Sequence, residues 1–175
     1  MSNFDNNWRR KQEIRMRPVA DKIYEQIFGD GISIDRFEQE DNYLLDKEFA
    51  TDAKVRMSNG MILLGQEKFL SHRYAKYESV TVEYEQNQFT GEEGDWFKLG
   101  VQFYFVGYCT DDDTDFAPWI MLNWPAVVLL SNDNEIPWRL NRNKDGRAKA
   151  SFYYCSMAAF PQEAVISSSW EVETN

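Results

Sequence analysis

The chain contains little of the chemistry on which many common enzymes depend. Its 175 residues include one histidine, His72, and two cysteines, Cys109 and Cys155. A single imidazole would have to fill every histidine role in a zinc hydrolase or a Ser-His-acid triad, which argues against both. The cysteines match no metal-binding or redox spacing. No Gly-rich phosphate loop is present, because the segment 91–94 is acidic and follows no suitable strand.

Long apolar runs and an excess of basic residues are also missing. Without a signal segment or a stretch long enough to span a membrane, we expect a cytoplasmic protein that does not associate with membranes. The chain has 19 Lys and Arg against 29 Asp and Glu, a formal charge of −10, which argues against non-specific coating of nucleic acid. The charge is uneven, because residues 1–20 carry a surplus of three positive charges and 111–115 form an acidic loop. A phosphodiester held through a bound metal ion remains compatible with this acidic average.

The abundant residues indicate an ordered globular protein. Hydrophobic residues make up 43% of the chain and aromatic residues 15%, so large rings must fill much of a core or line a cleft. At this length we expect a single domain that buries its core without disulfides or a structural metal. The predicted fold class is α+β (α/β), with a central mixed β-sheet flanked by helices.

Hydrophobic periodicity predicts the order of the elements. It indicates a helix at 18–28, strands at 32–37, 49–57, 61–70 and 79–85, a helix at 96–106, a strand at 118–123, a short apolar element at 126–130 and a strand at 150–155. The segment 96–106 fits two patterns, since Trp96 and Phe103 share one helical face whereas 101–106 is aromatic enough for a strand. The helix is favoured, and on it Lys98 and Gln102 would share a face at i,i+4.

The segment 52–68 is the most informative part of the chain. Its Asn59-Gly60 pair predicts a tight β-hairpin turn, because both residues tolerate the positive φ that such turns require. Polar residues lie on the two strands far from this turn, where a hairpin needs none. They are therefore candidates for a functional site.

Two registers of this hairpin bring different residues together. If residues 58–60 form a three-residue loop, Asp52 lies opposite Gln66 and diagonal to Lys68, with all three side chains on one face. A two-residue turn would instead place Asp52 opposite Glu67. In either register an acid, an amide or second acid, and a lysine come within reach of one metal ion and one phosphate.

This order of elements, with Asp52 and the tripeptide Gln66-Glu67-Lys68 on adjacent strands, resembles the PD-(D/E)XK nuclease superfamily, also called restriction-endonuclease-like. The resemblance covers about residues 18–123 and implies an αβββαβ core, which leaves 124–175 as a C-terminal elaboration. Members of this superfamily bind one or two Mg²⁺ ions and cleave phosphodiester bonds. The resemblance therefore implies a Mg²⁺ cofactor, with Mn²⁺ as a substitute, and a nucleic-acid partner, DNA in the first place.

The resemblance also implies roles for individual residues. Asp52 would bridge the metal, and Lys68 would orient or activate the attacking water and offset charge on the phosphate. Gln66 stands where the superfamily usually has Glu or Asp, although some members look similar in using Gln-x-Lys, and the amide removes one charge from the metal site. Strand alternation, in turn, places Glu67 on the face opposite to Lys68, from which it can still contribute its backbone carbonyl to the metal.

Three further positions follow from the same resemblance. Such members often recruit a Glu from the first helix, which nominates Glu25 as a metal ligand. Polar residues on the helix after the lysine strand commonly contact the phosphate or the metal shell, which nominates Lys98 and Gln102. Other acids near the first helix compete with Glu25 for its role: Glu40, Asp41 and Asp46.

The leading functional expectation is thus a Mg²⁺-dependent nuclease that hydrolyses DNA. In a second interpretation the chain has the same fold but does not cleave DNA, and serves as a catalytically inactive binding or regulatory module. A third is an acidic protein-interaction domain whose exposed aromatic residues bind a partner. Cleavage of both strands of a duplex would favour a homodimer, since two sites must address two strands.

Overall fold

The computed structural model describes residues 3–37, 49–142 and 149–170. These residues form a mixed α+β structure with few helices. The α-helices are α1 (Asn3–Phe28) and α3 (Trp124–Asn132), and the short 3₁₀ helices are η1 (His72–Tyr77), η2 (Asp95–Phe97), η3 (Met157–Ala159) and η4 (Gln162–Ala164). None of the described helices has the length and apolar character that crossing a membrane requires.

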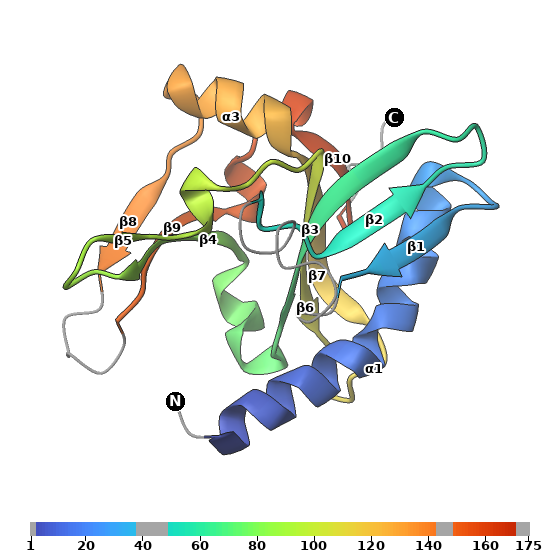
Figure 1. Cartoon of the computed structure of the whole chain (residues 1–175), viewed down its shortest axis with the longest axis horizontal. Coiled ribbons are helices and arrows are strands. Elements are labelled where there is room, and N and C mark those ends of the chain that lie inside the picture. Colours follow the sequence, from blue (N-terminus) through green and yellow to red (C-terminus); the bar gives the residue numbers. More distant parts are fainter. Residues whose placement is uncertain (1–2, 38–48, 143–148, 171–175) are drawn as a thin grey trace.

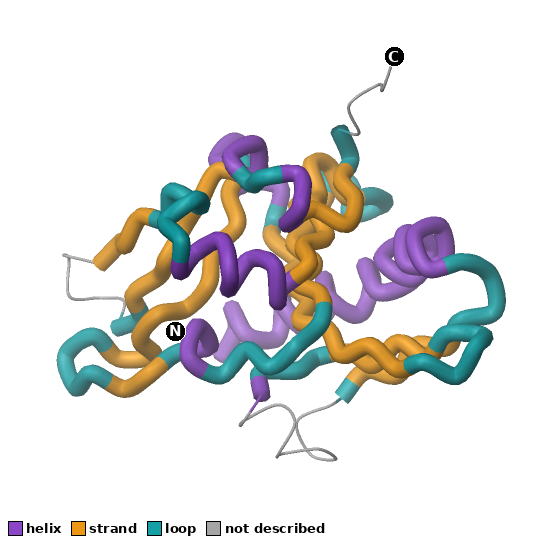
Figure 2. The backbone as a smooth tube through the Cα atoms, turned by 90° about the horizontal axis from the view of Figure 1, so that it is seen from above, coloured by secondary structure: helices purple, strands orange, loops and turns teal. Residues whose placement is uncertain are grey.

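The strands form two sheets. In chain order they are β1 (Ser33–Arg36), β2 (Ala53–Arg56), β3 (Ile62–Leu70), β4 (Ser79–Asn87), β5 (Glu92–Glu93), β6 (Phe103–Cys109), β7 (Phe116–Asn123), β8 (Arg139–Arg142), β9 (Ser151–Ser156) and β10 (Val165–Ser168). The first sheet has the order β1-β2-β3-β6-β7-β10, in which β3 and β6 run parallel and all other neighbours antiparallel. The second, antiparallel sheet has the order β5-β4-β9-β8. The two lie toward opposite ends of the molecule's long axis (Figures 1 and 2).

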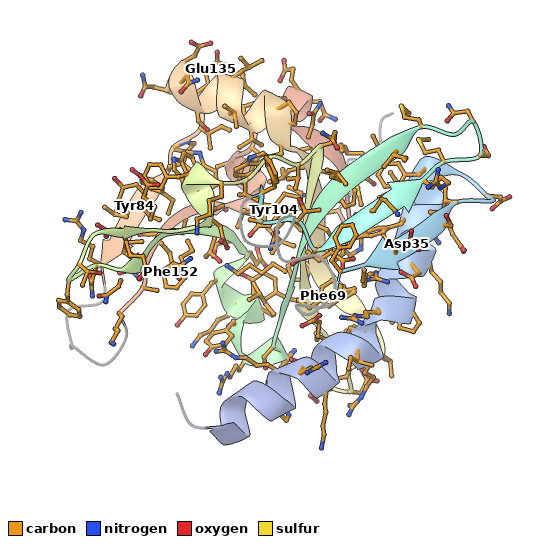
Figure 3. The ribbon with its side chains drawn as sticks, viewed as in Figure 1. Asp35, Phe69, Tyr84, Tyr104, Glu135 and Phe152 are labelled. Atoms are coloured by element: carbon orange, nitrogen blue, oxygen red, sulfur yellow. The ribbon has the colours of Figure 1, made fainter. Side chains whose placement is uncertain are left out.

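Helix α1 covers one face of the first sheet. Met16, Ala20 and Tyr24 are fully buried on its inner side, where they pack against Phe103 and other rings of the central strands. Phe69 of β3 packs against the same cluster and lies between the sheet and α1 (Figure 3). The predicted helix at 18–28 is thus correct in position and too short, because the helix already begins at Asn3 and Pro18 lies inside it. The burial of Met16, before the proline, shows that tertiary packing outweighs the local cost of Pro18.

The other face of the first sheet packs against the second sheet and α3. Its core combines aliphatic residues of β4 with rings that meet edge to face, among them Tyr104, Trp124 and Trp96. The centre of the first sheet is therefore buried on both faces, whereas its edge strand β1 is partly exposed. Strand β6, at this centre, is buried along its whole length.

That double burial explains why the helix predicted at 96–106 is wrong. The segment forms η2 followed by the start of β6. A strand buried on both faces carries a continuous apolar run rather than an alternating one, and such a run also satisfies helical spacing. The helix of the expected αβββαβ order between the third and fourth strands is absent from the described residues, and η1, the β4–β5 hairpin and η2 make that connection instead.

The remaining predictions on the described residues divide clearly. The strands expected at 32–37, 49–57, 61–70, 79–85, 118–123 and 150–155 are present, with ends differing by a few residues. The apolar element at 126–130 is helix α3, which begins after Asn123, whose side chain accepts a hydrogen bond from the Ala126 amide at its first turn. Strands β5, β8 and β10 were not predicted. The competing acids Glu40, Asp41 and Asp46 lie outside the described residues.

Candidate active site

The β2–β3 hairpin adopts the three-residue loop. Arg56 pairs with Ile62 and Ala53 with Gly65, and the Met57 amide donates to the Met61 carbonyl at 2.8 Å across residues 58–60. Gly60 closes the loop with φ of +84°, a left-handed conformation that favours glycine.

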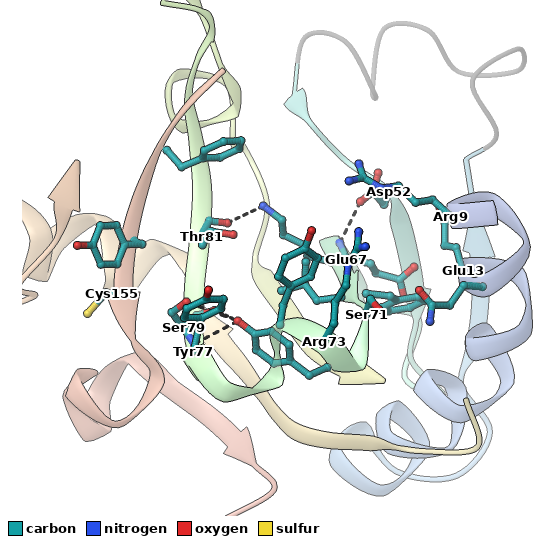
Figure 4. Close-up of a pocket in the computed structure, with 18 of the residues that line it drawn as sticks. Arg9, Glu13, Asp52, Glu67, Ser71, Arg73, Tyr77, Ser79, Thr81 and Cys155 are labelled. Atoms are coloured by element: carbon teal, nitrogen blue, oxygen red, sulfur yellow. Dashed lines mark hydrogen bonds between the residues drawn. The ribbon is translucent and has the colours of Figure 1, made fainter. Parts of the chain in front are cut away.

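The ladder ends at the Ala53–Gly65 pair, and its register is the one from which Asp52 was predicted to lie opposite Gln66. Beyond the end of β2 the Asp52 amide still donates to the Gly65 carbonyl at 2.9 Å. The next free backbone amide of β3, that of Glu67, donates to the Asp52 side chain instead of to a backbone carbonyl, with 3.0 Å between the amide nitrogen and Oδ2 (Figure 4). Both bonds fix the half-buried carboxylate at the edge of β3.

The residues of the Gln66-Glu67-Lys68 tripeptide divide between the two faces of the sheet. Glu67 is directed toward α1, where Tyr24 Oη donates to its Oε1 at 2.8 Å. Arg36 of β1 donates Nε to Glu67 Oε2 at 2.8 Å and Nη2 to Oε1 at 2.9 Å. Since the Glu67 side chain is only 7% exposed and holds three donors, it ties α1, β1 and β3 together.

Gln66 and Lys68 are on the opposite face of β3, beside Tyr104 and Val106 of the parallel strand β6. The Gln66 Oε1 atom is buried and has no hydrogen-bond partner among the described residues. An unpaired buried acceptor is costly unless another group completes it. Gln66 therefore offers an oxygen donor on the face of β3 that carries Lys68.

Lys68 crosses from the first sheet to the second. Its Nζ donates to the Thr81 carbonyl of β4 at 2.9 Å, and Tyr104 Oη donates to the same oxygen at 2.9 Å. The ammonium also lies 5.7 Å from the centroid of the Phe152 ring. Burial lowers the pKa of Lys68, and three nearby carboxylates oppose this shift, in decreasing order Asp95, Glu83 and Asp52.

Two of these acids were missed by sequence reasoning. Glu83 lies on β4, and Asp95 begins η2 directly after Gly94. A Cβ on Gly94 would lie 2.6 Å from the Glu83 carbonyl oxygen, so the glycine permits η2 to approach β4. Burial raises the pKa of Glu83, and the Asp95 carboxylate raises it further. The alternation of 79–85 carries a signal for Glu83, because it separates the buried Val80 and Val82 from the polar face.

The other nominated residues are not brought to Asp52. Glu25 is exposed on α1. The acid of α1 that lines the cleft described below is Glu13, about three helical turns before Glu25. The side-chain Oε1 of Gln102 accepts a hydrogen bond from the Leu64 backbone amide at 2.7 Å. The backbone amide of Gln102 donates to the Leu64 carbonyl at 2.8 Å, so Gln102 extends the β3–β6 pairing. Lys98 ends η2, near Glu83.

A cleft of about 1290 Å³ opens over Asp52 and Lys68. Arg9 and Glu13 of α1 stand on one side, and Thr81 of β4 on the other, with Arg9 extending toward Asp52 (Figure 4). The far wall is one face of the second sheet, because cross-strand neighbours of β4, β9 and β8 line it together: Ser79, Thr81, Phe152, Tyr154, Arg139 and Asn141. Strand β8 is short, polar and exposed, so no sequence pattern indicated this wall.

The charge of the cleft is opposite to that of the chain. Its lining contains six cationic side chains and three acidic ones, whereas the whole chain has a formal charge of −10. The cationic residues come from five different elements: Arg9, Arg17, Arg36, Lys68, Arg73 and Arg139. Low-dielectric walls focus such a field, so the cleft favours an anionic ligand.

Comparison with protein-family models, with curated proteins and with solved structures gives no match for this chain. Within the described part of the chain, no three His, Cys, Asp or Glu side chains are arranged to hold a metal ion. The carboxylates of Asp95 and Glu83 act on Lys68 from η2 and β4, and the hairpin itself supplies the Asp52 carboxylate and the unpaired Gln66 Oε1. This all-oxygen pair suits a hard cation such as Mg²⁺ or Mn²⁺, held weakly because only one ligand is charged.

Proposed function

We propose that this protein is a metal-dependent nuclease that hydrolyses phosphodiester bonds of DNA in the cleft over Asp52 and Lys68. The observation that carries the proposal is the reversal of charge, since six cations line the cleft of an acidic chain. Lys and Arg side chains supply most of the affinity of proteins for the phosphate backbone. The resemblance of Asp52 and Gln66-Glu67-Lys68 to the PD-(D/E)XK pattern supports the same conclusion.

Asp52 and Lys68, which line the cleft, and Gln66, whose buried Oε1 lies outside that lining, would divide the chemistry among them. Asp52 and Gln66 would hold Mg²⁺, which supplies a Lewis acid that polarises the phosphate and lowers the pKa of bound water. Lys68, held by the Thr81 carbonyl, provides positive charge for the additional negative charge that develops on the phosphate when water attacks. Hydrolysis adds water across one P–O bond, and leaves a phosphate on one product and a hydroxyl on the other.

The test is incubation of the protein with plasmid and with single-stranded DNA, in Mg²⁺ and in Mn²⁺, beside Asp52→Ala and Lys68→Ala. We expect cleavage by the wild type that both variants lose. Asp35→Ala is the matched control, because Asp35 is an exposed strand acid that pairs with Lys54 and does not line the cleft. Cleavage that survives in Asp52→Ala, or that needs no divalent ion, would contradict the proposal.

A second candidate is a binding module of the same fold without cleavage. Gln66 in place of an acid, and the lack of a three-acid metal cluster in the described part of the chain, favour it. Gln66→Glu separates the two candidates. A nuclease should keep or gain activity with this variant, whereas a binding module should hold DNA in the cleft and cleave it in neither form.

A further inference from the structure

Aromatic side chains stand exposed on the walls of the cleft. Tyr77 is 61% exposed, Trp8 46% and Tyr74 38%, and all three line it. They come from two elements, Trp8 from α1 and both tyrosines from η1. Large rings gain free energy by leaving water, so their concentration at one concave site indicates a ligand with flat apolar faces.

Cations alternate with these rings. Arg9 follows Trp8 in α1, and Arg73 precedes Tyr74 in η1, with its guanidinium carbon 4.7 Å from the centroid of the Tyr74 ring. On the opposite wall Arg139 is the cross-strand neighbour of Tyr154. A surface on which positive charge and rings alternate matches a polymer in which phosphates and bases alternate.

We propose that the cleft binds a single strand of nucleic acid, with its phosphates on the arginines and its bases stacked on Tyr77, Tyr74 and Trp8. This inference rests on the proposed function and specifies its substrate. A duplex presents phosphates outward and keeps its base faces stacked inside, so the aromatic side chains on the cleft walls cannot stack on its bases. Unpaired bases expose those faces to the rings.

The experiment measures binding without cleavage. Fluorescence anisotropy with a labelled thymidine oligonucleotide, and with a duplex of equal length, is carried out in EDTA so that no metal ion is present. We expect at least tenfold tighter binding of the single strand. Tyr77→Ala should weaken single-strand binding by fivefold or more, since one stacked base contributes about 1–3 kcal/mol.

Matched variants identify stacking as the cause. Tyr77→Phe keeps the ring and should retain the affinity within about twofold, because one hydroxyl at an exposed site contributes little. Phe89→Ala removes a ring that is 66% exposed at the β4–β5 turn, outside the cleft, and should leave binding unchanged. Arg73→Ala should weaken binding of both the single strand and the duplex, because it removes a phosphate contact.

The outcomes distinguish this inference from the proposed function. Equal or tighter binding of the duplex, or an unchanged affinity in Tyr77→Ala, overturns the single-strand inference, and cleavage that depends on Asp52 then still supports a nuclease. If neither form of DNA binds and neither is cleaved, both the inference and the proposed function fail.

Discussion

Arg36 and Glu67 form a two-point ion pair between β1 and β3, with bonds of 2.8 and 2.9 Å and side chains only 10% and 7% exposed. Both residues also line the cleft, and Glu67 lies between Gln66 and Lys68 in β3. The ion pair anchors one face of β3. The opposite face of the same strand presents Lys68 and the unpaired Gln66 Oε1.

Removal of one partner of this pair should destabilise the fold strongly. Arg36→Leu leaves a buried carboxylate uncompensated, and should lower the free energy of unfolding by about 3–5 kcal/mol. The double variant Arg36→Leu/Glu67→Leu should recover most of this loss, because Asp21, the other partner of Arg36 at 2.7 Å, is 38% exposed and can be solvated. Urea unfolding of the single and double variants measures the coupling. Lys54→Ala, which breaks the exposed pair with Asp35, serves as control and should cost about 1 kcal/mol or less.

The arginines of the cleft should determine how binding of single-stranded DNA depends on salt. Each phosphate contact contributes a slope of about 0.7 in a plot of log affinity against log salt concentration. Arg73→Ala should therefore reduce the slope by about 0.7. Arg15, which pairs with Asp113 at 2.9 Å and does not line the cleft, provides the control. An equal reduction in Arg15→Ala would show that binding is not confined to the cleft.

Lys68 should make stability rise with pH in the alkaline range. Burial lowers its pKa in the folded chain, so between that value and the unfolded value of about 10.4 the unfolded chain binds more protons. Methionine does not titrate, so Lys68→Met lacks this contribution to the pH dependence of stability. The free energy of unfolding of the wild type should therefore increase relative to Lys68→Met as pH rises toward about 10. Urea unfolding at a series of pH values tests this, and a difference that stays constant with pH would contradict it.

Gly94→Ala should separate η2 from β4 and damage the site. The new Cβ would lie 2.6 Å from the Glu83 carbonyl oxygen, in a strand that β9 holds in place, so η2 and Asp95 must move. We expect a loss of about 1–3 kcal/mol in stability and slower cleavage, measured by thermal unfolding and initial rates. Gly91→Ala is the matched control. Its φ of +71° makes alanine strained by about 1 kcal/mol, but no atom lies within 4 Å, so cleavage should stay unchanged.

Local patterns predicted the part of the site that lies on neighbouring strands. The Asn59-Gly60 turn determines the register, and strand alternation then places Gln66 and Lys68 on one face. The far wall could not be predicted, because it requires β4 to pair with β9 across a long stretch of chain and with no local turn between them. The aromatic run that starts at Phe103 was misassigned, since a strand buried on both faces loses the alternation that identifies strands.

Lys68 and Tyr104 both donate hydrogen bonds to the Thr81 carbonyl, so the position of Lys68 depends on β4, and β4 is completed late in biosynthesis. This strand gains its main partner only when residues 151–156 have formed β9. A growing chain that has reached residue 150 contains Asp52 and Lys68 but lacks Phe152 and Tyr154, the part of the far wall that β9 supplies. Asp52 and Lys68 are therefore synthesised early and enclosed late. The ribosome must extend the chain past β9 before this wall of the cleft is complete.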